Sequence, residues 1–139
     1  MLAGLILLGA LAALSMLPPY LGPSLGLELD VPSNVEVVDH VVAGGTVVLA
    51  SLAAAWALQS GRITADSPWI MAAVGLGVLG AVWETATHVP LVLEGGEPQS
   101  PWSTVLFHSV PAGLVMVVAL SLLWRLLAEP PEEEGRSAP

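Results

Sequence analysis

Glu84 and His88 are two ionisable residues, four positions apart, inside a long apolar stretch from Trp69 to Leu93. Residues four apart lie on the same face of an α-helix, so a carboxylate and an imidazole would stand side by side there. A stretch of about 20 apolar residues is long enough to cross a membrane. Because ionisable side chains are costly inside hydrocarbon, this pair is a candidate functional site for metal binding or proton transfer.

The chain has three histidines, and the other two are His40 and His108. Each histidine is about five residues from one end of its predicted helix, which corresponds to a depth of roughly 8 Å at ~1.5 Å per residue. In an alternating bundle those three helix ends lie on one side, so we expect all three imidazoles in one layer. Glu84 is predicted one turn deeper than this layer, and Glu36 one turn shallower than His40.

This layer contains ligands suited to a cofactor. Three neutral imidazoles with Glu84 form a plausible ligand set for a transition metal ion such as zinc, copper or iron. Alternatively, His40 and His108, on opposite helices, could hold a haem b from both sides, with His88 and Glu84 beside the ligands. Small residues on the predicted helices would allow either close backbone approach or room for a flat ligand. These are Gly44, Gly77, Gly80 and Ala81.

The same residues allow two interpretations without a resident cofactor. A histidine–carboxylate pair near a surface can contact a quinol or pass protons, and the predicted proton-transfer residues are Glu84, Glu36 and Asp39. In a purely structural interpretation, His40 pairs with Glu36 and His88 pairs with Glu84 within single helices. Interhelical polar contacts are also common in membrane bundles, where they are worth about 0.6 kcal/mol on average.

The composition places the chain among membrane proteins. Of its 139 residues, 55% are hydrophobic and only 11% are charged, against roughly 25% charged in soluble domains. The absence of cysteine excludes disulfides, thiolate metal sites and iron–sulfur clusters. With a net charge of -9 and no lysine, the chain has no basic patch for nucleic acid. Acid-rich, lysine-free loops and termini are typical of a halophilic source.

Four hydrophobic segments predict an all-α integral membrane fold. They form a four-helix transmembrane bundle with up-down-up-down topology and short loops, spanning residues 1–128. An acidic tail over 129–139, rich in glutamate and proline, is predicted to be disordered. The predicted helices cover about 2–21, 35–58, 69–93 and 103–127.

A shift of the sequence by 68 residues aligns several residues of the two halves. Matches in apolar helices arise easily by chance, so duplication and coincidence both remain open. A duplication would give two repeated helical hairpins related by an axis along the membrane normal, with the histidines of the second and fourth helices as symmetry mates. The aligned pairs are Gly9/Gly77, Val37/Val105, His40/His108, Gly45/Gly113 and Trp56/Trp124.

The three arginines predict the orientation in the cell membrane. Arg62 follows the second helix, and Arg125 and Arg136 are near the C-terminus. Four crossings place all three on one side, and the positive-inside rule makes that side cytoplasmic. We therefore expect a multi-pass protein with both termini in the cytoplasm and the histidine layer near the outer face.

These features predict a small integral-membrane subunit of an electron-transfer or respiratory complex. Its histidine and glutamate layer would bind or border a haem, a metal or a quinone, and the chain would be a non-catalytic subunit rather than a stand-alone enzyme. Its expected partners are the lipid bilayer and other membrane subunits or further copies of itself. A proton or ion conduit is the first alternative, although a single polar layer leaves the inner half of a monomer without polar steps. A structural assembly subunit with no cofactor is the second.

Overall fold

The computed structural model describes residues 1–17, 38–94 and 110–128, and regular structure in this part of the chain is entirely helical, as predicted. The predicted starts of the second and fourth helices, at 35 and 103, and the predicted tail lie outside the described residues. The elements are α1 (Leu2–Ser15), the π-helical turn η2 (Val38–Val42), α4 (Ala43–Gln59), α5 (Pro68–Glu94) and α7 (Val110–Ala128).

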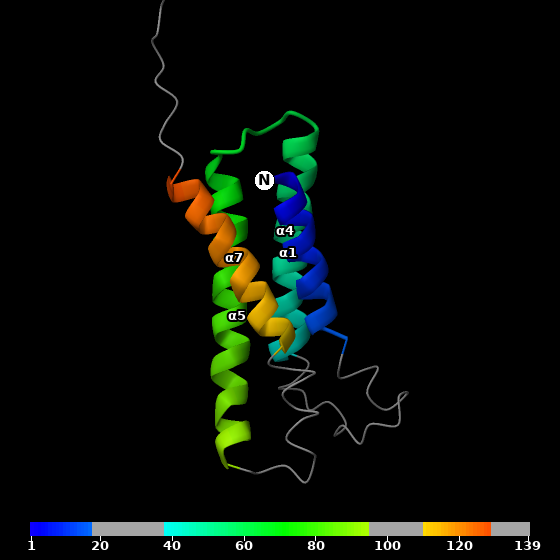
Figure 1. The fold of residues 1–139 in the computed structure, drawn as a ribbon. Coiled ribbons are helices and arrows are strands. Elements are labelled where there is room, and N and C mark those ends of the chain that lie inside the picture. The colour runs from blue at the N-terminus through cyan, green and yellow to red at the C-terminus, as the bar shows by residue number, and fades with distance from the viewer. Residues whose placement is uncertain (18–37, 95–109, 129–139) are drawn as a thin grey trace, which may run out of the picture.

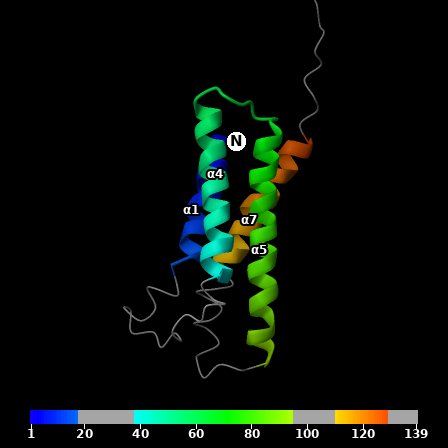
Figure 2. The same cartoon turned by 180° about the vertical axis from the view of Figure 1, so that it is seen from behind.

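The four α-helices of the described residues form a bundle in which each helix packs against two neighbours. Helix α1 contacts α4 and α7, and α5 contacts the same two helices, whereas α1 and α5 lie diagonally and touch only slightly. The chain direction alternates from helix to helix (Figure 1). As a result, the start of α1, the loop between α4 and α5, and the end of α7 lie at one end of the bundle, and η2 lies at the other (Figure 2).

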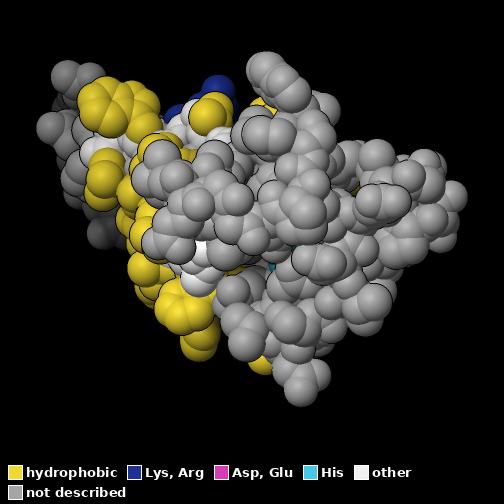
Figure 3. All heavy atoms as spheres, turned by 90° about the horizontal axis from the view of Figure 1, so that it is seen from below, with side chains coloured by type: hydrophobic (Ala, Val, Ile, Leu, Met, Phe, Trp, Pro, Cys, Tyr) yellow, Lys and Arg dark blue, Asp and Glu magenta, His cyan; other side chains and the backbone are white. Residues whose placement is uncertain are grey.

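Three of these helices are long and apolar enough to cross a membrane, namely His40–Gln59, Pro68–Thr87 and Val110–Ala128. Their outward faces carry large exposed apolar side chains such as Leu49, Val117 and Leu127. Figure 3 shows hydrophobic side chains along the flank that the grey atoms leave visible. This surface is compatible with lipid contact, while insertion and orientation stay predictions.

The first helix is shorter than predicted. It ends at Ser15 instead of continuing to about residue 21, and its 14 residues span about 21 Å, less than a hydrocarbon core of about 30 Å. The reason is the Pro18-Pro19 pair. Proline has no N–H, so neither residue can bond to a carbonyl of the preceding turn. The last turn instead tightens, with the Leu17 amide donating to the Leu14 carbonyl at 3.2 Å.

Glycines allow the helices to approach closely. A Cβ at Gly44 would lie 3.2 Å from the Ala12 carbonyl oxygen of α1. A Cβ at Gly80 would lie 3.0 Å from Val47 of α4. Side chains or backbone of neighbouring helices therefore lie close to both residues, and also to Gly77. The expectation that the small residues leave room for a flat ligand is wrong for Gly44 and Gly77, which serve helix packing. Gly80 packs against Val47 and also lines a shallow groove between α4 and α5.

Burial repeats between α4 and α7 at the spacing of 68 found in the sequence. Four buried positions of α4 correspond to four buried positions of α7, and the α1–α4 pair packs as extensively as the α5–α7 pair. This arrangement is the one expected of two repeated hairpins, although duplication itself stays a prediction. The corresponding buried residues are Gly44/Ala112, Val47/Val115, Ser51/Ala119 and Ala54/Leu122.

The loop after α4 begins with a Schellman motif. Gly61 has a φ of 67°, in the left-handed region. The Gly61 amide donates to the Leu58 carbonyl at 3.1 Å, and the Arg62 amide donates to the Ala57 carbonyl at 2.9 Å. This motif folds residue 62 back against the last turn of α4. The Arg62 guanidinium consequently lies over the ring of Trp56, 4.1 Å from its centroid.

Replacement of Gly61 by alanine should lower the free energy of unfolding by about 1–2 kcal/mol, because a Cβ is unfavourable in the left-handed conformation. The measurement is equilibrium unfolding of the purified chain in bicelles. Gly75→Ala is the matched control, since Gly75 lies inside α5 and a Cβ there would meet nothing within 4 Å. Equal stability of the two variants would contradict the role given to Gly61.

Candidate functional site

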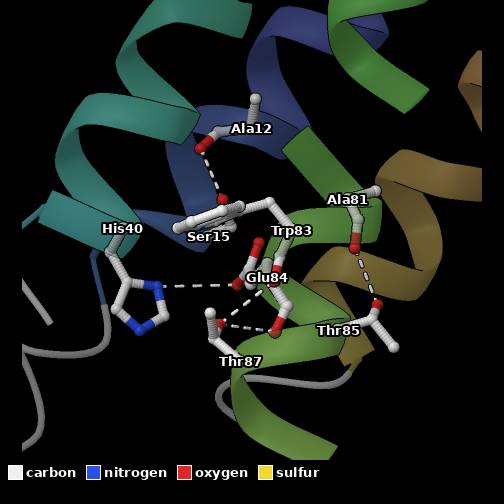
Figure 4. A network of polar contacts seen from close by, with 8 residues as sticks. All are labelled: Ala12, Ser15, His40, Ala81, Trp83, Glu84, Thr85 and Thr87. Carbon is white, nitrogen blue, oxygen red and sulfur yellow. Dashed lines mark hydrogen bonds and ion pairs between the residues drawn. The ribbon is translucent and has the colours of Figure 1, made fainter. Parts of the chain in front are cut away.

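His40 and Glu84 meet at the end of the bundle where α4 begins. The imidazole Nδ1 lies 3.5 Å from the carboxylate Oε1. The residues come from different elements, His40 from η2 and Glu84 from α5, and they are 1% and 7% exposed. Figure 4 shows the two side chains pointing toward one another between the helices. The predicted metal site includes both residues in one ligand set, but a direct contact between them was not predicted from the sequence.

A widened helical turn carries His40. Residues Val38–Val42 form a π-helical turn before regular α-helix begins at Ala43. Such turns are rare and occur frequently at functional sites, because they redirect a side chain without ending the helix. Directly after it, Gly44 brings α4 close to α1. The π turn and the close approach together place the imidazole inside the bundle.

Hydroxyl groups accompany the pair at the same end of the bundle (Figure 4). Ser15 of α1 is buried, and its Oγ donates to the Ala12 carbonyl at 2.8 Å. On α5, Thr85 donates to the Ala81 carbonyl at 2.7 Å, and Thr87 donates to the carbonyls of the preceding turn. Three of the four buried polar or charged residues in the described chain, Ser15, His40 and Glu84, therefore lie at this end.

The pair is suited to holding and exchanging a proton. With one proton shared between them, the two groups exist either as imidazole and carboxylic acid or as imidazolium and carboxylate, and both forms have zero net charge. Transfer between Nδ1 and Oε1 interconverts these forms without moving a net charge into an apolar interior, which is the costly step there.

The predicted depth of the residues needs one correction. Counting from helix ends placed Glu84 one turn deeper than His40, but the two side chains lie at the same level. That count assumed helix ends at one height, whereas α5 extends beyond η2 (Figure 1). The His88 backbone lies one turn past Glu84 along α5.

Several predicted site residues fall where the structure gives no side-chain account. Glu36 and His108 lie outside the described residues. For Asp39 and His88 only the helical backbone is described. The predicted pairings of His40 with Glu36 and of His88 with Glu84 therefore stay predictions.

Metal or haem ligation would need more than the described pair. Among side chains with a described position, no group of three or more histidine, cysteine, aspartate or glutamate residues gathers. His40 and Glu84 could supply one nitrogen and one oxygen ligand, which suits zinc, copper or iron in principle. Further ligands would come from His88 or His108, so the four-residue metal site and the haem b site both stay predictions.

Two buried serines were missed in the sequence. Ser15 reads as the end of a hydrophobic segment before two prolines, and Ser51 as an ordinary residue of an apolar helix. Ser51 is fully buried, and its Oγ has no hydrogen-bond partner among the described residues. At the shift of 68, Ser51 aligns with Ala119, whose burial is known only from the structure, so the sequence contains no clear signal for a buried Ser51.

No family model, curated protein or solved structure matches this chain. The site is therefore interpreted from its own geometry.

Proposed function

We propose that this chain is a small integral-membrane subunit of an electron-transfer or respiratory complex. His40 and Glu84 take up and release a proton at a site that borders a quinone, a haem or a metal near the outer face. Both termini face the cytoplasm, and the neighbouring partners are other membrane subunits or further copies of the chain. The chain holds and orients the reacting group and is not itself the enzyme.

The buried His40–Glu84 contact is the observation that carries this proposal. Ionisable side chains in an apolar bundle are costly, and where they occur they mark proton relays and substrate sites. Here they meet across two helices, and a π turn redirects one of them. A chain that needed only packing could place apolar residues at both positions with little loss of stability.

The test is purification of the full chain in a mild detergent together with the proteins that accompany it. Optical spectra of the oxidised and reduced sample report haem, elemental analysis reports metals, and mass spectrometry of the extracted lipids reports quinones. We expect at least one of these in stoichiometric amount, lost in His40→Ala and retained in Thr85→Val. A sample with no redox group and no redox-active partner would contradict the proposal.

A proton conduit is the second candidate, and Ser51 favours it. Ser51 lies eleven positions after His40, which is about 16 Å further along the helix axis. It therefore gives the inner half of the bundle a buried polar group that was not expected from the sequence. In vesicles that contain the purified chain, a conduit would pass protons under an imposed pH gradient, and Glu84→Gln would abolish that flux. The absence of flux in the wild type would contradict the conduit.

A further inference from the structure

The seam between α4 and α5 contains a groove near the end opposite His40. Its volume is about 580 Å³, within the range of roughly 300–1,000 Å³ typical of ligand pockets. Four alanines of α4 and two of α5 line it, and Trp56 and Trp69 line it at the end where the connecting loop joins the helices. Both tryptophans are more than half exposed.

The groove is not a by-product of the repeated helix pattern. At the shift of 68, its α4 alanines correspond to larger residues of α7. Leu122, the counterpart of Ala54, packs against Gly4 of α1 and occupies the space between α7 and α1. The α4–α5 pair therefore has small residues on α4 at positions where the corresponding pair, α7 and α1, has larger side chains on α7. The corresponding pairs are Ala50/Val118, Ala53/Ser121, Ala54/Leu122 and Ala57/Arg125.

Arg62 adds a positive charge at the end of this groove. Its side chain lines the groove, and the Trp56 ring covers one face of the guanidinium at 4.1 Å from the ring centroid. Stacking of this kind leaves the N–H groups at the edge of the guanidinium plane available as donors, in a geometry that matches phosphate oxygens. Within the described chain, Arg62 forms no ion pair with a carboxylate.

The nearest acidic residue in the loop is engaged elsewhere. Asp66 accepts a hydrogen bond from the Thr64 hydroxyl, and that hydrogen bond lowers the pKa of the Asp66 carboxyl. Asp66 therefore keeps its negative charge, but among the described residues it forms no ion pair with Arg62, and it does not line the groove. Arg62 is the charged residue in the lining of the groove, where it lies beside two aromatic residues typical of a membrane interface.

We propose that this groove binds one anionic phospholipid. An acyl chain lies against the alanines between α4 and α5, the tryptophans flank the chain where it meets the headgroup, and the phosphate accepts hydrogen bonds from Arg62. An apolar groove alone would accept any lipid, so the arginine is what selects a net negative headgroup. The site is separate from His40 and Glu84 and does not depend on the function proposed for them.

The experiment is native mass spectrometry of the full chain in detergent, with equal amounts of phosphatidylglycerol and phosphatidylcholine that share the same acyl chains. We expect one bound lipid and a preference of about fivefold for phosphatidylglycerol, the effect of one arginine near an anionic headgroup. Arg62→Gln should remove the preference, and Arg62→Lys should keep most of it. Ala53→Phe, which fills the groove from an exposed position, should reduce binding of both lipids.

Arg125→Gln is the matched control. Arg125 is also an exposed arginine, it lies at the same end of the bundle in the last turn of α7, and it does not line the groove. This variant should bind as the wild type does. Equal binding of the two lipids by the wild type, an unchanged preference in Arg62→Gln, unchanged binding in Ala53→Phe, or displacement of phosphatidylglycerol by a neutral isoprenoid quinone would each overturn the proposal.

Discussion

Replacement of Glu84 by leucine should destabilise the bundle by about 3 kcal/mol, because it leaves the buried imidazole of His40 without its carboxylate. Removing one member of a buried ion pair typically costs about 3–5 kcal/mol. We take the lower end of this range because a neutral imidazole is less costly to bury alone than an imidazolium. In a membrane, the unfolded helices also find polar partners, which reduces the measured difference. The measurement is equilibrium unfolding of the full chain in bicelles.

The double variant His40→Leu/Glu84→Leu distinguishes a paired interaction from simple loss of packing. Replacing both members of a buried pair by apolar residues of similar size is often neutral or stabilising. We therefore expect the double variant to recover most of the stability that the single variant loses. Thr85→Val is the control, because Thr85 is next to Glu84 but is exposed and bonds to its own helix. A Glu84→Leu variant as stable as Thr85→Val would show that the His40–Glu84 contact does not stabilise the bundle.

The activity of the double variant also distinguishes a functional role of the pair from a purely structural one. A double variant that is folded and stable but loses a bound redox group, or loses proton flux, would mean that the chain keeps the pair for chemistry. A double variant that is stable and retains every activity would favour a structural subunit whose polar residues only fix the pairing of helices. The stability measurement therefore has to precede any interpretation of lost activity at these positions.

The helices could be predicted because their signals are local. Proline and glycine mark the loop at Gly61 and Pro68, and the apolar runs have the length of membrane crossings. The C-terminal end of α4 and both ends of α5 were therefore predicted to within one residue. The end of α1 was missed because the prediction extended its apolar run through Pro18 and Pro19 to reach the length of a crossing. The prolines, rather than hydrophobicity, determine where that helix stops.

The His40–Glu84 contact could not be predicted in the same way. Whether two residues on different helices meet depends on the axial offset between those helices. Helix ends read from a sequence do not give that offset. Here α5 extends beyond η2, and the π turn at Val38–Val42 changes the direction of His40. A single sequence contains no clear signal for a π turn, since the same residues would also form ordinary α-helix. What the sequence could identify was the small set of candidates, because ionisable residues are few in an apolar chain.

Gly77→Leu should destabilise the bundle by about 3 kcal/mol relative to Gly75→Leu, because only the first glycine lies where three helices converge. A Cβ at Gly77 would lie 3.1 Å from a Leu8 methyl of α1 and 3.3 Å from the Ala119 Cβ of α7. Both neighbours are fully buried, so neither can turn outward to make room. Overpacking of a filled interior typically costs about 1–3 kcal/mol and can cost more, and a leucine adds three carbons beyond the Cβ.

Gly75 makes this comparison specific to packing. It lies on the same helix two residues earlier, and a Cβ there would meet nothing within 4 Å. The gain in helix propensity on replacing glycine, about 1 kcal/mol, is shared by both variants and cancels in the difference. Unfolding of both variants in bicelles gives that difference directly. A difference near zero would mean that α1, α5 and α7 do not converge at Gly77.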